Sequence, residues 1–264
     1  MRVLLYVPLC VMIVCVGAVV GALLLHVSPA AMVQALSAAD TLFALRLSLC
    51  TSAGALALAL VMGIPSAYLL ARRQFPGKVL VDTLLDLPLV MTPLVAGVGL
   101  LFLFGQGWLG GALARMGIQV LFTPWGAVVA QTFIATPIVI RTCTAAFEGV
   151  DRRYEQAGQT LGLRMDQVFV RITVPLAWQG IVSGAILAWA RALGEFGATL
   201  MIAGATRFKT ATLPISVYLN ISSGEIELAL ACAWLLLLAG FALLLGIKLA
   251  GRGRNPGTVT GGPR

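Results

Sequence analysis

Residues 144–175 read TAAFEGVDRRYEQAGQTLGLRMDQVFVRITVP, a polar stretch in an otherwise apolar chain. The stretch carries eight charged side chains: Glu148, Asp151, Arg152, Arg153, Glu155, Arg164, Asp166 and Arg171. Over the whole chain only 11% of residues are charged, and 59% are hydrophobic. The insert is too short to form a domain, and its helical pattern is not that of a linker. It predicts a structured loop between apolar helices.

The apolar segments on both sides of this insert indicate a membrane protein. Six runs without charge are Val3–Leu25, Leu47–Leu70, Leu87–Ala114, Met116–Ile140, Ile172–Ala190 and Leu228–Ile247. A helix needs about 20 apolar residues to cross the hydrocarbon core of a bilayer. Five runs reach that length, and Ile172–Ala190 reaches it if its helix continues past Arg191. We therefore predict an all-α membrane protein with six transmembrane helices in a lipid bilayer.

The basic residues predict the orientation of these helices. With the N-terminus in the cytoplasm, 13 of the 18 Lys and Arg residues fall on the inner side. They are Arg2, Arg72, Arg73, Lys78, Arg141, Arg152, Arg153, Arg164, Arg171, Lys248, Arg252, Arg254 and Arg264. Cytoplasmic loops of membrane proteins carry this excess of positive charge. Both termini are thus expected to be cytoplasmic, and the net charge of +8 signals topology, not nucleic-acid binding.

The chain divides into three expected parts. Residues 1–26 form a first transmembrane helix, whose apolar stretch is longer than that of a cleaved signal peptide. Residues 38–250 form a core with five further helices and a cytoplasmic loop at 147–175. The Gly-rich polar tail at 251–264 is expected to be disordered. Within the core, the third helix should start near Asp86 and be kinked by Pro88 and Pro93.

The polar insert has the pattern of two short helices separated by glycine. The first helix includes Ala157 and Gly158, small residues that another surface can approach closely. Gly162 suits the left-handed position that ends a helix. A second amphipathic helix from Arg164 to about Ile172 should follow, and Pro175 should begin the next spanning helix. This arrangement is suited to docking into a groove of a soluble partner.

The spacing within this loop resembles the EAA loop of binding-protein-dependent ABC importer permeases. The matching positions are Gln156, Ala157, Gly158, Gly162, Ile172, Val174 and Pro175. Gln156 stands where the motif has Glu, Gly158 replaces its second Ala, and Val174 replaces its Leu. The resemblance implies coupling to an ATPase through Glu155, Gln156, Ala157, Gly158, Gly162, Ile172 and Pro175. Which acidic side chain contacts the ATPase stays open.

The resemblance extends from Leu36 to Arg252 and narrows the substrate. Residues 72–78 (RRQFPGK), 86–90 (DLPLV) and 190–198 (ARALGEFGA) resemble molybdate permeases and their sulfate and tungstate relatives. Compact outer loops and residues 223–229 (SGEIELA) favour molybdate over tungstate, sulfate or thiosulfate. The resemblance implies a homodimer in the cell inner membrane, two separate ATPase subunits that bind ATP and Mg, and an extracytoplasmic oxyanion-binding protein. The chain itself would bind no cofactor.

Charged residues within the fifth apolar run are candidates for the transport pathway. Small and charged residues recur at helical spacing in the stripe Gly180, Gly184, Ala188, Arg191, Glu195 and Ala198. Exposing charge to lipid costs about 2.5–3.5 kcal/mol on insertion scales, so we expect this stripe to face the protein interior. Two readings of Arg191 and Glu195 remain open. They form a self-neutralising structural pair, which we favour, or Arg191 also contacts the transported dianion.

Two other classes of function fit the sequence less well. An enzyme with a histidine-based metal site or a Ser-His-Asp triad needs more than the single residue His26. No G-x-x-x-x-G-K-[ST] motif is present, so ATP should be hydrolysed on another polypeptide. A non-transporting structural or sensory membrane subunit would explain the helices but not the spacing of the loop. We therefore assign no catalytic residue and no metal ligand.

Overall fold

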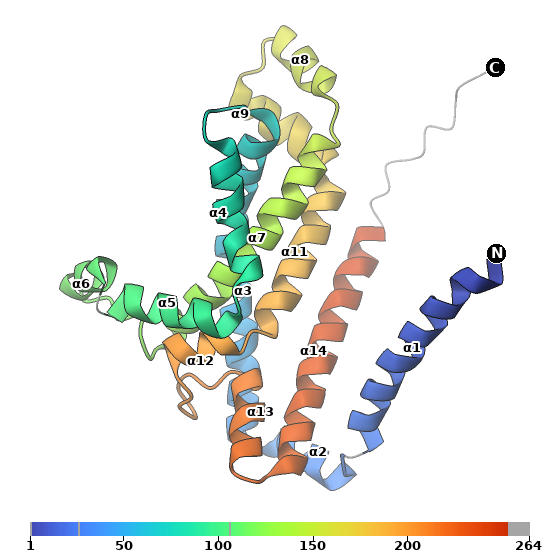
Figure 1. Cartoon of the computed structure of the whole chain (residues 1–264), viewed down its shortest axis with the longest axis vertical. Coiled ribbons are helices and arrows are strands. Elements are labelled where there is room, and N and C mark those ends of the chain that lie inside the picture. Colours follow the sequence, from blue (N-terminus) through green and yellow to red (C-terminus); the bar gives the residue numbers. More distant parts are fainter. Residues whose placement is uncertain (1, 26, 106, 253–264) are drawn as a thin grey trace. The chain divides into compact units, whose positions relative to one another are not determined.

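A computed structural model describes residues 2–25, 27–105 and 107–252, and these described residues form helices and loops without a strand (Figure 1). The helices are α1 (Arg2–Leu25), α2 (Pro29–Ser37), α3 (Ala39–Arg72), α4 (Lys78–Val90), α5 (Pro93–Gly105), α6 (Trp108–Arg115), α7 (Pro124–Glu148), α8 (Arg152–Thr160), α9 (Met165–Val168), α10 (Val174–Leu176), α11 (Trp178–Leu193), α12 (Gly197–Ala203), α13 (Leu213–Ser222) and α14 (Ile226–Arg252). A π-helical turn, Phe169–Thr173, links α9 to α10. The predicted disordered tail lies almost entirely outside the described residues.

The chain forms two compact units. Unit 1 comprises Met1–Ser48 and Ala205–Ala239, and unit 2 comprises Leu49–Gly204 and Gly240–Arg264. Helices α3 and α14 therefore contribute residues to both units. The predicted coupling loop and the charged residues of the fifth apolar run all belong to unit 2.

Helix α7 is the central element of unit 2. It begins with Pro124 in the first turn, where the missing N–H of proline leaves no helical hydrogen bond unmade. Helix α11 runs beside it (Figure 1). A Cβ atom on Gly180 would overlap the Ala146 Cβ, and one on Gly184 would overlap the Thr142 Oγ1. The small residues of the predicted stripe thus allow α11 to approach α7 of the same chain.

Two predicted spanning helices are broken. The third begins at Lys78, not near Asp86, and consists of α4 and α5 bent by 112°. The expected proline kink is therefore a complete break, with Met91 in an extended conformation before Pro93. Helix α5 then packs on α12, where a Cβ on Gly97 would lie 2.7 Å from the Ala198 Cα.

The fifth spanning helix also differs from the prediction. It begins at Trp178 rather than Pro175, because the segment Met165–Leu176 is bent by 76° from α11. Helix α11 ends at Leu193, and its C-cap is Gly194. Glu195 consequently lies beyond the helix, and the stripe from Gly180 to Ala198 is not continuous. The break after Leu193 arises because Gly194 caps α11 and a separate helix, α12, follows. The helical spacing of the stripe residues did not indicate this break.

Unit 1 contains a short helix, α13, that none of the six apolar runs in the sequence indicated. Helix α13 packs its buried Leu213 in a small core with Ala44, Cys232 and Leu235. The loop before α13 is held by Arg207, whose Nη1 lies 3.3 Å from Asp40 Oδ2. Arg207 Nη2 also donates to Asn220 Oδ1 at 3.2 Å.

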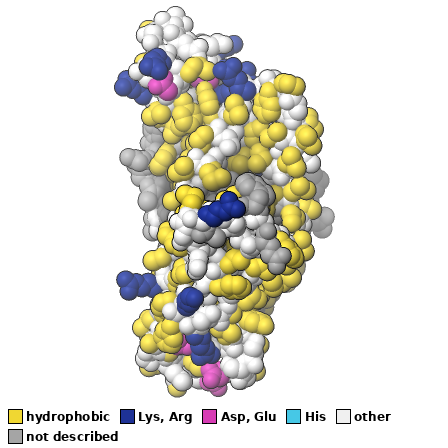
Figure 2. Space-filling model, turned by 90° about the vertical axis from the view of Figure 1, so that its left-hand side faces the viewer, with side chains coloured by type: hydrophobic (Ala, Val, Ile, Leu, Met, Phe, Trp, Pro, Cys, Tyr) yellow, Lys and Arg dark blue, Asp and Glu magenta, His cyan; other side chains and the backbone are white. Residues whose placement is uncertain are grey.

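The described helices fit a multi-pass membrane protein. Three helices are long and apolar enough to cross a bilayer, and two bent pairs would raise the number to five. The segment Ile226–Ala242 of α14 is a shorter apolar helix. In Figure 2, charged side chains gather over the α8–α9 end of unit 2, beside a largely hydrophobic surface. Large apolar side chains of α4 are exposed, among them Val79 and Leu80.

Candidate functional site

The predicted helix–glycine–helix loop is formed by α8, α9 and the π-helical turn. Asp151 caps α8 by accepting a hydrogen bond from the Arg153 backbone N–H at 2.9 Å. Gly162 has φ of +85°, the left-handed conformation that the sequence predicted at the end of α8. The second helix is shorter and less regular than expected, because α9 ends at Val168 and continues as the π-helical turn.

Glu155 lies on the inner face of α8 in a buried ion pair. Its Oε1 is 2.9 Å from Arg72 Nε, and the two side chains are only 11% and 8% exposed. The Thr173 hydroxyl donates to the same carboxylate oxygen at 2.9 Å. Arg72 also donates through Nη2 to the Val150 carbonyl at 2.9 Å. This network, which we call the α8 joint, connects α8 to the end of α3 and to the π-helical turn.

Gly158 also faces inward. A Cβ atom at this position would lie 2.5 Å from Ile172 Cδ1 and 3.3 Å from Val168 Cγ2. The sequence suggested that Ala157 and Gly158 admit another surface, but at Gly158 that surface is the second half of the same loop. The spacing between Gly158 and Ile172 is thereby explained by internal packing.

Other side chains in and directly after α8 are exposed. Tyr154 and Leu161 are 58% and 83% exposed, and Gln156 and Ala157 are also exposed. Tyr154 and Ala157 are three residues apart on α8, and Leu161 follows as the C-cap residue of the helix. We call this set the outer face of α8. Exposed aromatic and aliphatic side chains on one helix face are typical of an interaction site.

Aromatic side chains connect the loop to the helices of unit 2. Tyr68 of α3 lies with its ring centroid 5.7 Å from Phe147 of α7 and 4.6 Å from Phe169 of the π-helical turn. Together with the α8 joint, this cluster fixes the loop to α3 and α7. The loop is consequently an extension of the helical body, which we define as α7, α8, α11 and the part of α3 from Leu49 onward.

Arg191 and Glu195 form the predicted i,i+4 ion pair, with Arg191 Nη1 2.6 Å from Glu195 Oε2. The Glu195 side chain is 1% exposed, whereas that of Arg191 is 38% exposed. The other carboxylate oxygen of Glu195 accepts from the Ala198 N–H at 3.0 Å in the first turn of α12. The remaining stripe candidates, Gly184 and Ala188, are buried on α11. Glu195 thus has a structural role at the break between α11 and α12.

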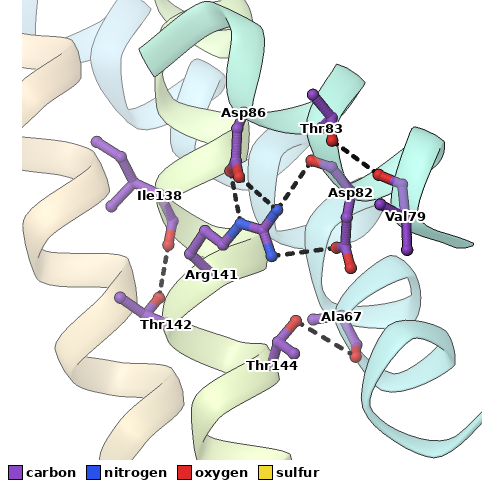
Figure 3. Close-up of polar contacts among 9 residues, drawn as sticks. All are labelled: Ala67, Val79, Asp82, Thr83, Asp86, Ile138, Arg141, Thr142 and Thr144. Carbon is purple, nitrogen blue, oxygen red and sulfur yellow. Dashed lines mark hydrogen bonds and ion pairs between the residues drawn. The ribbon is translucent and has the colours of Figure 1, made fainter. Parts of the chain in front are cut away.

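A second charged cluster was missed by sequence reasoning. Arg141 of α7 binds two carboxylates of α4, Asp82 and Asp86 (Figure 3). Its Nε and Nη2 donate to Asp86 at 2.6 and 2.7 Å, and Nη1 donates to Asp82 Oδ1 at 3.1 Å. Nη2 also donates to the Asp82 carbonyl at 2.9 Å. The sequence signal for this cluster was the pair of aspartates spaced four residues apart on one helix. Their partner, Arg141, lies 55–59 residues away along the chain.

Comparisons with known proteins agree with this architecture. The model for the family "binding-protein-dependent transport system inner membrane component" matches residues 59–253. The molybdenum transport system permease protein of Escherichia coli K12 is 42% identical over 211 residues, which cover 78% of this chain and 92% of that protein. The equivalent protein of Mycobacterium tuberculosis is 39% identical over 207 residues, 77% of each chain. A sulfate transport system permease protein of Synechocystis is 36% identical, covering 81% of this chain and 78% of that protein.

A solved structure shows the same fold at low sequence identity. A chain of a bacterial alginate ABC transporter, in complex with an alginate pentasaccharide-bound periplasmic protein, has a TM-score of 0.76 at 18% identity. The match covers 95% of this chain and 94% of that chain. The family match spans most of the sequence and includes the predicted coupling loop. The protein therefore belongs to the family of inner membrane components of binding-protein-dependent transport systems.

Proposed function

We propose that this chain is the permease subunit of an ABC importer that carries molybdate across the inner membrane. The observation that carries the proposal is the coupling loop, in which a rigidly held α8 presents an exposed apolar face. A sensory subunit without transport would not need such a surface. Molybdate is inferred from the names of the relatives that are 39–42% identical.

A sulfate importer is the second candidate. The Synechocystis sulfate permease is nearly as similar to this chain as the molybdenum permeases are. Tungstate has the same charge and tetrahedral shape as molybdate, so it belongs to the same proposal as an alternative substrate. Selection among these dianions is expected in the separate binding protein, which meets the anion first.

The proposed assembly contains four membrane-associated subunits and a delivery protein. Two copies of this chain would form the pore, and two ATPase subunits would bind ATP and Mg. An extracytoplasmic oxyanion-binding protein would deliver the anion. The alginate transporter chain with the same fold was solved in complex with a periplasmic binding protein, which supports this arrangement.

The outer face of α8 is the proposed contact with the ATPase. Glu155 is occupied in the α8 joint, so it positions the helix and does not reach the partner. Tyr154, Ala157 and Leu161 are the side chains available for an apolar groove, and Gln156 adds a polar contact at its edge. An interface of this kind obtains most of its affinity from a few buried aromatic and aliphatic side chains.

The proposed topology has six spanning segments with both termini in the cytoplasm. α1, α3 and α7 would each span once, and the bent pair α4–α5 would form one span. α11 would form a further span, with the bent segment Met165–Leu176 leading into it. α14 would supply the sixth. The concentration of basic residues at the α8 side supports this orientation.

The transport pathway is proposed to pass the junction of α11 and α12. Arg191 is the partly exposed member of its ion pair, so its guanidinium is available to an approaching anion. Glu195 would neutralise part of its charge and keep the anion from binding too tightly to leave.

Reconstituted with its ATPase and binding protein in proteoliposomes, the chain should support ATP-dependent uptake of molybdate. Excess tungstate should compete with radioactive molybdate, because both are tetrahedral dianions of similar size. Excess sulfate should compete far less well. Sulfate uptake that exceeds molybdate uptake would instead establish the second candidate, and uptake of neither anion would refute the proposal.

Leu161→Ala should weaken binding of the ATPase, because it removes the most exposed apolar side chain of the outer face. Loss of one such anchor costs about 1–2 kcal/mol, or roughly tenfold in affinity. Affinity of the purified permease for the ATPase and ATP hydrolysis stimulated by the binding protein should fall together. The melting temperature of the permease alone should stay unchanged.

The matched control is Ile226→Ala, which removes an exposed apolar side chain at the start of α14. It should leave both measurements at the parental level. Normal ATPase binding by Leu161→Ala would show that the outer face of α8 is not the docking surface.

Single cysteines in a cysteine-free background should report the topology. Cysteine at Ser37 or Ser223 should react with a membrane-impermeant maleimide in intact cells, because the proposed topology places both sites outside. Cysteine at Thr258 should react only after the membrane is opened. Labelling of position 258 in intact cells would contradict the six-span topology.

Arg191→Leu should destabilise the permease more than Glu195→Gln does. The first change leaves a buried carboxylate without its partner, which typically costs about 3–5 kcal/mol, whereas Arg191 without Glu195 remains partly hydrated. The double variant should recover most of the melting temperature. If Arg191 also contacts the anion, uptake by the double variant stays low, and if the pair is structural only, uptake returns. Single variants as stable and active as the parent would refute both roles.

A further inference from the structure

We propose that α4 is a separately movable arm of unit 2 and that Arg141 is the latch that fastens it to α7. The inference rests on the proposed function as a transport subunit, and it adds a mechanical role for residues outside the coupling loop. In each transport cycle the latch opens, and α4 moves relative to the helical body.

Within one copy of the chain, few contacts other than the latch hold α4. None of its side chains, all of which the structure describes, is buried. Large apolar residues along the helix are strongly exposed, including Val79 and Leu80. Arg141 meanwhile directs four hydrogen bonds at two successive turns of α4, through Asp82 and Asp86 (Figure 3). Opening the latch would therefore remove most of the specific polar attachment between α4 and α7.

The latch differs from the α8 joint in its access to water. The side chains of Arg141, Asp82 and Asp86 are 34%, 31% and 43% exposed. When partly exposed charges separate, water replaces much of what they lose, so ion pairs of this kind open readily. Arg72 and Glu155 are only 8% and 11% exposed, and separating them would leave buried charges unpaired. The Arg141 latch is therefore suited to opening, and the α8 joint is suited to transmitting force.

Both ends of α4 allow it to move as a unit. At its C-terminal end, the chain leaves α4 in the extended conformation of Met91 and turns by 112° into α5. Helix α5 is held by the close approach of Gly97 to Ala198 on α12, so the pivot has a fixed support. At the N-terminal end, Gly77 has φ of +84°, and a Cβ atom added to it would meet no other atom within 4 Å. The C-terminal end of α4 thus has the features of a hinge, and its N-terminal end has open space around Gly77.

A cavity of about 260 Å³ lies beside the latch. Its charged lining includes Lys78 and Asp82 of α4 and Arg141 and Glu148 of α7. Charged walls and open access allow water to enter, and water can solvate Arg141 and the aspartates once they separate.

Because α8 is joined to α3 through Glu155, movement of the loop carries the helical body with it. Helix α4 can keep its position during this movement only if the hydrogen bonds from Arg141 are broken.

The test is a reversible crosslink between α4 and α7. Lys78→Cys and Glu148→Cys, in a cysteine-free background, place one thiol from each helix at the cavity without altering the latch. A short bifunctional methanethiosulfonate reagent should join them in the resting complex. Crosslinking should abolish most ATP-driven anion uptake, and reduction should restore it. Uptake at an equal rate in the crosslinked and reduced complexes would overturn the proposal.

The matched control joins α7 to α3 within the helical body. Gly54→Cys and Val128→Cys are suitable, because a Cβ on Gly54 would lie 3.8 Å from both Val128 methyl groups. This crosslink should leave uptake close to that of the reduced complex. If it blocks uptake as strongly as the α4–α7 crosslink does, the distinction between arm and body is wrong.

Asp86→Asn provides a second test. It removes one charge from the latch and should raise ATP hydrolysis in the absence of binding protein several-fold, with a smaller loss of melting temperature than Glu155→Gln causes. A larger loss of melting temperature with unchanged basal hydrolysis would make the cluster a static clamp. These readouts use ATP hydrolysis and are independent of which anion is carried. A result that refutes the latch can therefore be told apart from a result that refutes the proposed anion.

Discussion

The buried ion pair between Glu155 and Arg72 is the constraint on which the coupling loop depends. A carboxylate removed from water must keep its partners, and here they come from two places, the end of α3 and Thr173 of the π-helical turn. This requirement fixes which face of α8 turns inward. The outer face is then available to another protein, while the loop remains a rigid part of the helical body.

Three of the ion-pair networks in unit 2 differ in how far their side chains are exposed. The α8 joint is almost inaccessible to water, so it resists opening. The pair Arg191–Glu195 combines a fully buried carboxylate with a partly exposed guanidinium, and the carboxylate also receives the N–H of Ala198. In the Arg141 latch all three side chains are partly exposed, by 31% to 43%. A transporter needs both rigid connections and connections that open, and exposure to solvent separates them here.

Several local features were correctly predicted because they depend on neighbouring residues. The left-handed Gly162 and the interruption near Pro93 follow from the backbone restrictions of glycine and proline. The break after Leu193 was missed, because apolar periodicity continues through it and no proline marks it. Helix α13 was missed because its 10 residues are too few for a spanning helix.

The sequence by itself determined that the protein is helical and membrane-embedded, and that it carries the loop of an importer permease. Apolar run length and the spacing around Gly162 are local properties, so they can be read along the chain. Only the tertiary structure decided that Glu155 and Gly158 face inward and that Arg141 holds Asp82 and Asp86. Those contacts join residues 10 to 83 positions apart. No periodic pattern specifies such a pair, because its distance is set by how whole helices pack.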